Sequence, residues 1–348
     1  LHRVPEKLME YKTYFKNFLF MDRLDYVAPL NYEHCYVLAI EKLLNCDVPL
    51  RGKYLRVLFS ELSRVNRHLF AIGALANDAG AMTPFVWAIE EREKIMAFFE
   101  AASGGRMHMN YFRPGGVAKD VPEGLLDTIY KWSESFPTDF KDICNLLTNN
   151  RIFKQRTVDV GIIDKEEAIN FGFSGPNLRA SGVAWDLRRA QPYEIYDELD
   201  FNVIVGENGD SYDRYLVRVN EVYESLKIIK QCLQKIPEGS VIVNDYEIAP
   251  PHRAQMKTSM EALIHHFKLF SEGINAPKGE VYVAVETPTG EFGIYLVSCG
   301  GPKLYRAKLR SNGLAHLQAL KRIINGYQLA DIPIILGSLD VVFGEIDR

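Results

Sequence analysis

The stretch LFSELSRVNRHLFAIGALA, residues 58–76, decides the fold class of this 348-residue chain. Its apolar side chains recur at intervals of 4, 3, 4, 3 and 4 residues, at Leu58, Leu62, Val65, Leu69, Ile72 and Ala76. This spacing places them on one stripe of an α-helix. The charged side chains between them lie off that stripe, at Glu61, Arg64, Arg67 and His68. A long amphipathic helix packed against other elements is therefore expected.

The helical pattern extends over residues 10–102 on both sides of this stretch. The proline turn Met82-Thr83-Pro84 separates two helices, and Ser103-Gly104-Gly105 ends the second of them. A further helical segment follows over residues 124–149. We expect residues 1–150 to form a helical core.

The next two regions differ in character. Residues 151–215 are rich in turns, as in Phe171-Gly172-Phe173-Ser174-Gly175, whereas residues 216–278 return to helical spacing. One helix is expected over residues 217–234, and another is expected to open at Pro250-Pro251. The two resemble a packed antiparallel pair.

The last region, residues 279–348, begins with β-branched alternation on both sides of Thr287-Pro288-Thr289-Gly290, which predicts a hairpin. A short helix over residues 313–325 and an apolar tail over residues 332–343 follow. No repeat or Gly/Ser linker separates the regions. We therefore expect residues 1–348 to form a single α+β domain that is mainly helical.

Composition excludes several classes of protein. Hydrophobic residues make up 47% and charged residues 25%, values that are ordinary for a globular chain. Lys+Arg 41 against Asp+Glu 45 gives a net charge of −4, so the strong positive field of a nucleic-acid binder is missing. No apolar run approaches the ~20 residues that span a bilayer.

The chain also lacks common cofactor motifs. No two cysteines stand two or three residues apart, so the chain is not expected to hold an iron–sulfur cluster alone. Their odd number indicates a reducing compartment. Adjacent helical residues such as His265 and His266 point about 100° apart and cannot share an ion without a third ligand. The glycines form neither a dinucleotide fingerprint nor a P-loop.

Three loops concentrate polar and aromatic side chains, at residues 21–26, 77–85 and 104–116. Arginine–aspartate pairs and glycine turns also stabilise ordinary loops. The residues by themselves therefore leave a functional and a structural interpretation open.

These loops resemble those of the 49 kDa-type subunit of respiratory complex I, the NADH:ubiquinone oxidoreductase. Further segments carry the resemblance over essentially the whole chain, namely Asn149-Asn150-Arg151, Phe171 to Gly175, Asp213-Arg214-Tyr215 and Phe343-Gly344-Glu345-Ile346-Asp347-Arg348. Residues 256–268 look particularly like mitochondrial members. The resemblance implies a location on the matrix side of the mitochondrial inner membrane, in the peripheral arm of the complex.

The family is related to nickel-iron hydrogenase large subunits but has lost their metal, and the tail of this chain carries no Cys-x-x-Cys motif. The resemblance implies a hydrogenase-large-subunit-like body that binds neither metal nor flavin and takes ubiquinone as substrate. Its partners would be a subunit that holds the terminal [4Fe–4S] cluster, a 30 kDa-type subunit and other complex I subunits. The whole complex would couple electron transfer from NADH to proton pumping.

Quinone reduction consumes two electrons and two protons, so the site needs hydrogen-bond donors at the quinone carbonyls. By resemblance, Tyr26 donates to one carbonyl, and Asp78 pairs with a histidine at the other. The pocket walls would be Met82, Phe85, Asp340 and Val342. The residues near the partner's cluster would be Arg23, His108, Arg113 and Arg348.

In the family that histidine belongs to an N-terminal β-rich segment that this chain lacks, and we expect a separate polypeptide to supply it. Thr289 stands where relatives commonly have lysine. Two alternatives stay open. One is a hydrogenase-like or formate-linked enzyme, which the missing cysteines disfavour. The other is a scaffold subunit with an inactive pocket, which Tyr26, Asp78 and His108 disfavour.

Overall fold

The computed structural model describes residues 4–348, and it is mainly helical with two small antiparallel sheets. The helices of the first half are α1 (Pro5–Met9), α2 (Tyr14–Met21), α3 (Pro29–Leu44), α4 (Leu50–Asp78), α5 (Met82–Ser103) and α6 (Leu125–Leu147). Those of the second half are α7 (Arg151–Thr157), α8 (Lys165–Asn170), α9 (Gly175–Ala180), α10 (Leu187–Ala190), α11 (Ser211–Lys235), α12 (Met260–Ser271), α13 (Asn312–Ile323), α14 (Ile332–Leu339) and α15 (Phe343–Asp347). The strands are β1 (Phe112–Arg113), β2 (Gly116–Val117), β3 (Ala276–Thr287), β4 (Gly290–Gly301) and β5 (Arg306–Arg310). The predicted α+β class is confirmed.

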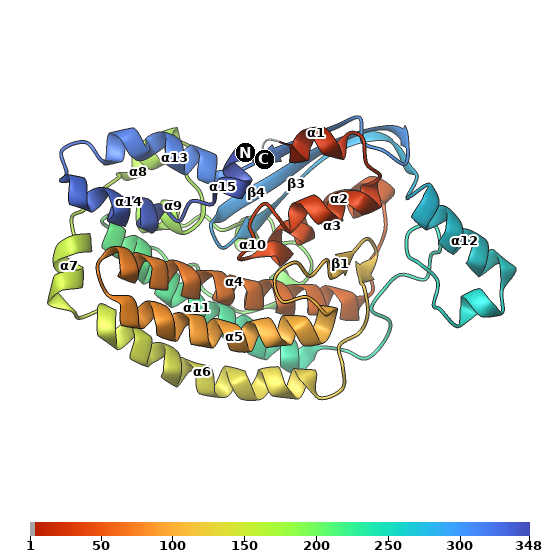
Figure 1. Ribbon diagram of the computed structural model, residues 1–348, viewed down its shortest axis with the longest axis horizontal. Helices are drawn as coiled ribbons and strands as arrows, with labels where there is room; N and C mark the ends of the chain where they lie inside the picture. Colours follow the sequence, from red (N-terminus) through yellow and green to blue (C-terminus); the bar gives the residue numbers. More distant parts are fainter. Residues whose placement is uncertain (1–3) are drawn as a thin grey trace.

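Helix α4 lies at the centre of the fold, and the amphipathic helix that its apolar stripe predicted is confirmed. Helices α4, α5, α6 and α11 lie side by side below the larger sheet, and α3 lies between this bundle and the strands (Figure 1). Because α11 also covers α4, the charged side chains off the stripe are buried too, at Glu61, Arg64, Arg67 and His68. Buried charges need partners, so α4 is a source of ion pairs as well as of apolar packing.

Helix α5 begins and ends close to the predicted places. Met82-Thr83-Pro84 is not a turn between helices but the first turn of α5. Proline is tolerated there because the backbone N–H groups of the first turn have no helical partner. At the other end Gly104 has a φ of 90°, and its backbone N–H caps the helix on the Glu100 carbonyl.

The larger sheet has the order β3-β4-β5. Thr287 pairs with Gly290, so Pro288 and Thr289 form a two-residue turn and the predicted hairpin is confirmed. Strand β5 pairs with β4, and the sequence pattern had not revealed it. Thr289 is buried within this turn.

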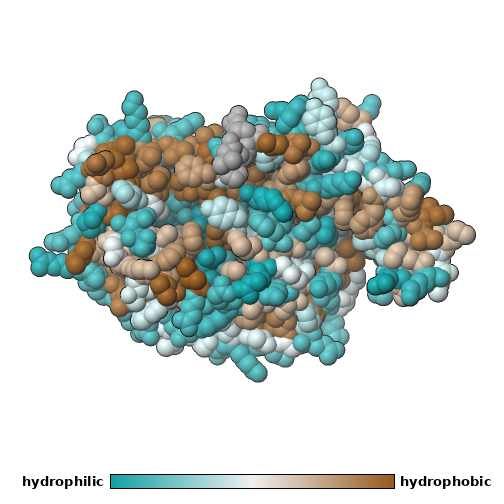
Figure 2. Space-filling view, viewed as in Figure 1, coloured by the Kyte–Doolittle hydropathy of each residue, from teal (hydrophilic) through white to brown (hydrophobic). Residues whose placement is uncertain are grey.

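The predicted antiparallel pair within residues 216–278 is wrong. Helix α11 packs against α4, α6, α9 and α14, whereas α12 begins only at Met260 and lies apart at one end of the molecule (Figure 1). Apolar side chains remain exposed at this end of the surface (Figure 2). They include Met260, Leu263, Ile264, Phe267 and Phe270. An apolar stripe predicts that a helix has a face to bury, but not which element covers it.

The rest of the chain is more helical than its turns suggested. Residues 151–215 contain the short helices α7 to α10, and the apolar tail forms α14 and the start of α15. A second, smaller core joins these parts, with Ile163, Phe173, Ala319, Ile335 and Leu339 among its buried members. Helix α14 also packs against α4, which fixes its position at the end of that helix.

Candidate functional site

The loop between α2 and α3 holds Tyr26 in a fixed and open position. Asp25 is fully buried, and its Oδ1 accepts hydrogen bonds from the backbone N–H of Val27 at 2.9 Å and of Ala28 at 3.4 Å. The Asn66 side chain donates to the Val27 carbonyl at 3.0 Å. The neighbouring Tyr26 side chain is 49% exposed. A rigid loop thus presents the phenol at the surface.

Arg67 of α4 joins this loop to the end of α14. Its guanidinium lies 3.4 Å from Asp25 Oδ2 and 2.7 Å from Asp340 Oδ1. Asp340 adopts a left-handed conformation, φ 54°, where α14 ends. Burial raises the pKa of Asp25, and the charge of Arg67 opposes that rise. One cation therefore holds two carboxylates from distant parts of the chain.

Asp78 is the last residue of α4 and lies against α14. An added Cβ at Gly337 would collide with Asp78 Oδ2, so a glycine leaves room for this carboxylate. The side chain is exposed, and no cation of the described residues lies within 4.0 Å of it. Partial desolvation raises the pKa of Asp78.

The residues predicted to form the pocket walls differ in solvent exposure. Met82 is 67% exposed in the first turn of α5, whereas Val342 is buried. Phe85 is half-buried, and its ring centroid lies 6.1 Å from that of Phe70. A cavity of about 110 Å³ lies beside the α4–α5 turn, lined by Ala79, Gly80, Ala81, Leu147, Asn150, Ile152 and Phe153.

These contacts bring four segments together around the second half of α4. Arg67 connects the Tyr26 loop with Asp340, and its guanidinium lies 5.8 Å from the Phe70 ring against which Phe85 packs. Gly337 brings Asp78 to the same end of α14. We use the name Tyr26 pocket for the predicted site residues Tyr26, Asp78, Met82, Phe85, Asp340 and Val342, together with Asp25 and Arg67.

The residues expected near the partner's cluster lie on adjoining segments. Arg23 and His108 are exposed. The Asn110 N–H donates to Asp22 Oδ2 at 3.2 Å, which ties the loop that carries His108 to the loop that carries Arg23. These two predicted residues therefore lie on loops that are held together.

The other two residues of that set are partly buried. The Arg113 guanidinium lies 4.9 Å from the Phe15 ring, and burial lowers its pKa. The Arg348 Nε lies 3.5 Å from Glu6 Oε1. Gly344 packs directly on the backbone of the Tyr26 loop, since an added Cβ would lie 2.6 Å from the Leu24 carbonyl oxygen. Helix α15 thus places Arg348 close to this loop.

Sequence reasoning missed the buried ionisable groups behind the loop. Asp22 and Glu33 are both buried, and desolvation raises the pKa of each. Glu345 is also buried, and desolvation followed by the charge of Asp25 raises its pKa to about 8. Acidic residues inside helical segments normally indicate a solvated face, so no local pattern indicated that these groups are buried.

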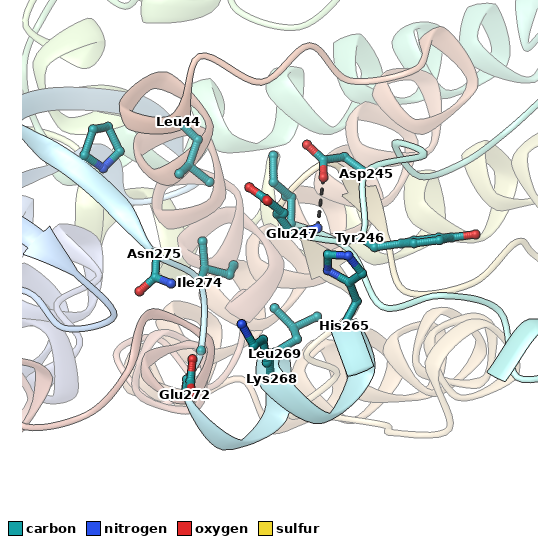
Figure 3. Close-up of a pocket in the computed structure, with 13 residues that line it drawn as sticks. Leu44, Asp245, Tyr246, Glu247, His265, Lys268, Leu269, Glu272, Ile274 and Asn275 are labelled. Carbon is teal, nitrogen blue, oxygen red and sulfur yellow. Dashed lines mark hydrogen bonds between the residues drawn. The ribbon is translucent and has the colours of Figure 1, made fainter. Parts of the chain in front are cut away.

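A separate cavity of about 390 Å³ lies at the other end of the molecule, between α12 and the segment before β3 (Figure 3). Asp245, Tyr246, His265 and Lys268 are among its lining residues, and the backbone N–H of Glu247 donates to Asp245 at 2.9 Å. No residue predicted for the quinone site lines it. It is therefore a distinct feature of the α12 region.

Over residues 4–348, no group of three or more His, Cys, Asp or Glu side chains is placed to hold a metal ion, and His265 and His266 are half-buried on α12. None of the helices described is long and apolar enough to cross a membrane.

Comparison with known proteins identifies the class first: this is a subunit of a respiratory-chain NADH dehydrogenase. Residues 78–348 match the family model for the 49 Kd subunit of that enzyme. The D subunit of the NADH-quinone oxidoreductase of Ehrlichia ruminantium (strain Welgevonden) is 58% identical over the whole chain and 88% of its own length. The corresponding protein of Wolbachia sp. subsp. Brugia malayi (strain TRS) is 59% identical over the whole chain and 89% of its length. The chain belongs to the 49 kDa subunit family of complex I, as its loops predicted.

Proposed function

We propose that the Tyr26 pocket is the place where this subunit binds the quinone headgroup while complex I reduces it. The observation that carries the proposal is the exposed Tyr26 phenol on a loop fixed by the Asp25–Arg67–Asp340 contacts. The relatives are named as subunits of an NADH-quinone oxidoreductase, which supports quinone as the substrate. Ubiquinone is the quinone we propose.

The geometry suits a proton donor. A phenolic O–H that donates to a quinone carbonyl forms a stronger hydrogen bond as the oxygen gains negative charge, so it stabilises the reduced headgroup more than the oxidised one. Asp78 lies at the end of α4 beside Gly337 with a raised pKa, and it is the second group we assign to proton transfer. Met82 and Phe85 offer apolar surface to the ring.

The adjoining face is proposed to contact the subunit that carries the terminal [4Fe–4S] cluster. When present, such a cluster delivers electrons one at a time to the quinone. This chain contributes no ligand set of its own within residues 4–348. The positive charges of Arg23, Arg113 and Arg348, with His108 on an adjoining loop, favour the more negative, reduced state of a neighbouring redox centre.

We further propose a peripheral position beside the membrane, with a 30 kDa-type subunit among the neighbours and proton pumping carried out by other subunits. For this chain we place the complex in the mitochondrial inner membrane, with the subunit on the matrix side. The support for that location is the similarity of residues 256–268 to mitochondrial members, whereas the relatives named above are bacterial.

Tyr26→Phe tests the proposal, because it removes only a hydroxyl from an exposed side chain. In the assembled complex we expect quinone reduction to fall at least ~10-fold, the equivalent of ~1.4 kcal/mol in transition-state stabilisation. Oxidation of NADH by an artificial acceptor at the flavin site should stay unchanged.

Tyr11→Phe is the matched control, since Tyr11 is 59% exposed and lies outside the pocket. It should leave quinone reduction as in the unmodified complex. Unaltered quinone kinetics in an assembled Tyr26→Phe complex would exclude Tyr26 from the reaction and leave the scaffold alternative.

A further inference from the structure

Glu345 is a fully enclosed acid behind the Tyr26 loop. It lies on α15 and is 1% exposed. The Gly313 N–H donates to its Oε1 at 3.1 Å, and the Tyr32 hydroxyl bonds to its Oε2. Among residues 4–348, no Lys, Arg or His nitrogen lies within the 4.0 Å of an ion pair with it.

The charged groups around Glu345 act on it from a distance. Asp25 on the α2–α3 loop and Arg67 on α4 both act on it electrostatically, the first disfavouring and the second favouring its ionised form. Arg67 is already shared between Asp25 and Asp340. Arg92 also acts on Asp25 and Arg218 on Asp340, so both of those carboxylates have further cations, whereas Glu345 has none within ion-pair distance among the described residues. An ionised Glu345 would therefore be a buried charge without a directly paired cation, which is costly in a protein interior.

The hydrogen bonds around Glu345 provide a place for the missing proton. Tyr32 lies 3.4 Å from the Thr289 hydroxyl, which lies 3.1 Å from the Thr287 hydroxyl. Thr287 donates to the Gly290 carbonyl at 2.7 Å. Because a hydroxyl can both donate and accept, a protonated Glu345 can donate to Tyr32 and each following hydroxyl then has an acceptor. The network therefore accommodates a protonated acid without leaving a donor unpaired.

Glu345 is also mechanically close to the loop. Its neighbour Gly344 packs on the backbone carbonyls of Arg23 and Leu24, directly before Asp25. A shift of α15 or of the Arg67 side chain would therefore displace the loop that carries Tyr26.

We propose that Glu345 is a positioning residue for quinone reduction, a buried acid whose bound proton leaves Arg67 free to hold Asp25 and Asp340. Loss of that proton places a third carboxylate in competition for Arg67 and repels Asp25, so the Tyr26 loop loses its fixed geometry. The inference rests on the proposed function of the Tyr26 pocket and adds a control of that pocket by pH.

The direction of the pH effect follows from the raised pKa of about 8. Below that pH the acid is protonated and the loop is held. One unit above it, about nine tenths of the groups are ionised, so the share of held loops falls about tenfold. Glu345→Gln keeps an amide that can bond Tyr32 and Gly313 but cannot ionise.

The test compares quinone reduction by the assembled complex between about pH 6.5 and about pH 9.5. The unmodified complex should lose about fivefold in activity from about pH 8 to about pH 9, and about tenfold from about pH 6.5 to about pH 9, whereas Glu345→Gln should lose that alkaline fall while keeping activity at neutral pH. Glu261→Gln, on the exposed side of α12, is the control and should retain the fall. A parallel alkaline fall in the Glu345→Gln and unmodified complexes overturns the proposal.

Tyr32→Phe provides a second variant that does not touch the acid. Because the Tyr32 hydroxyl favours the ionised form of Glu345, its removal should move the alkaline fall to higher pH. An unmoved fall contradicts the proposal even where Glu345→Gln does not assemble. The proposed function fails separately: an active Tyr26→Phe complex removes the quinone role, whereas an impaired Tyr26→Phe complex with no Glu345 effect removes only this inference.

Discussion

Two charged regions of this chain differ in how closely arginines pair with their carboxyl groups. In the first, which we call the paired core, Arg179 lies 2.8 Å from Glu286 Oε1 and 2.5 Å from Glu221 Oε1, and Arg188 lies 2.7 Å from Asp186 Oδ2. These arginines outweigh burial and lower the pKa of Asp186 to about 2 and that of Glu221 well below its usual range, whereas at Glu286 burial outweighs Arg179 and raises the pKa. In the Tyr26 pocket and directly behind it, by contrast, the pKa values of Asp25, Asp78 and Glu345 are all raised.

The two regions are therefore expected to serve different purposes, stability in the first and proton transfer in the second. Asp186 and Glu221, whose pKa values their arginines hold well below the usual range, stay ionised throughout the physiological range and serve to fix the fold. Asp78 and Glu345, which have no arginine within ion-pair distance among the described residues, are held nearer the pH at which they exchange protons, and proton-coupled quinone chemistry needs that property. Changes in the paired core should therefore alter stability, and changes in the Tyr26 pocket should alter turnover.

The largest effect is expected for Arg179→Met in the paired core. It leaves three buried carboxylates, those of Asp186, Glu221 and Glu286, without their shared cation. Breaking a buried ion pair from one side costs about 3–5 kcal/mol. Thermal unfolding temperature and the yield of assembled complex should both fall sharply. Lys230→Met, which removes an exposed pair with Glu134, is the control and should cost less than about 1 kcal/mol. Equal losses of unfolding temperature in Arg179→Met and Lys230→Met would contradict a special role of the paired core in stability.

A smaller effect is expected for Gly344→Ala, which should change both stability and quinone binding. The added Cβ would lie 2.6 Å from the Leu24 carbonyl and 2.9 Å from that of Arg23, so α15 or the Tyr26 loop must shift. Overpacking of this kind costs about 1–3 kcal/mol. The Michaelis constant for quinone should rise with only a modest change in melting temperature. Gly279→Ala, whose Cβ meets Leu43 at an ordinary 3.5 Å, should change neither quantity.

The smallest effect is expected for Asp78→Asn. Asp78 is exposed and makes no ion pair within the described chain, so the fold should be unaffected. Quinone reduction should fall about threefold to tenfold, since one proton-exchanging group is lost and Tyr26 remains. Asp142→Asn on the exposed side of α6 is the control. Unchanged turnover in Asp78→Asn would show that protons reach the quinone by another group.

The sequence predicted those parts of the fold that local chemistry determines. The stripe of α4, the Gly104 cap and the hairpin at Thr287 to Gly290 each depend on residues close together in the chain, and all three were found. The partner of α12 and the burial of Arg67 depend on which distant element arrives, and no local pattern contains that information. The wrong pairing of α11 and α12 has this cause.

The candidate site also contains residues that the sequence could indicate and residues that only the packing reveals. The resemblance predicted Tyr26, Asp78 and Asp340 as site residues, because they stand in recognisable sequence contexts. Glu345 and Tyr32 occupy equally ordinary helical positions, and only their burial against Asp25 and Arg67 distinguishes them. Polar residues that act from the interior are visible only when the packing is known.

The most direct test is to find where a photoreactive quinone analogue attaches in the assembled complex. Peptide mapping should place the label on segments of the Tyr26 pocket, around Tyr26, Met82 to Phe85 or Asp340 to Val342, and excess quinone should suppress it. The cavity beside α12, lined by Asp245, Tyr246 and His265, provides the internal comparison. Labelling only at that cavity, with no label at the Tyr26 pocket that excess quinone suppresses, would contradict the proposed quinone site.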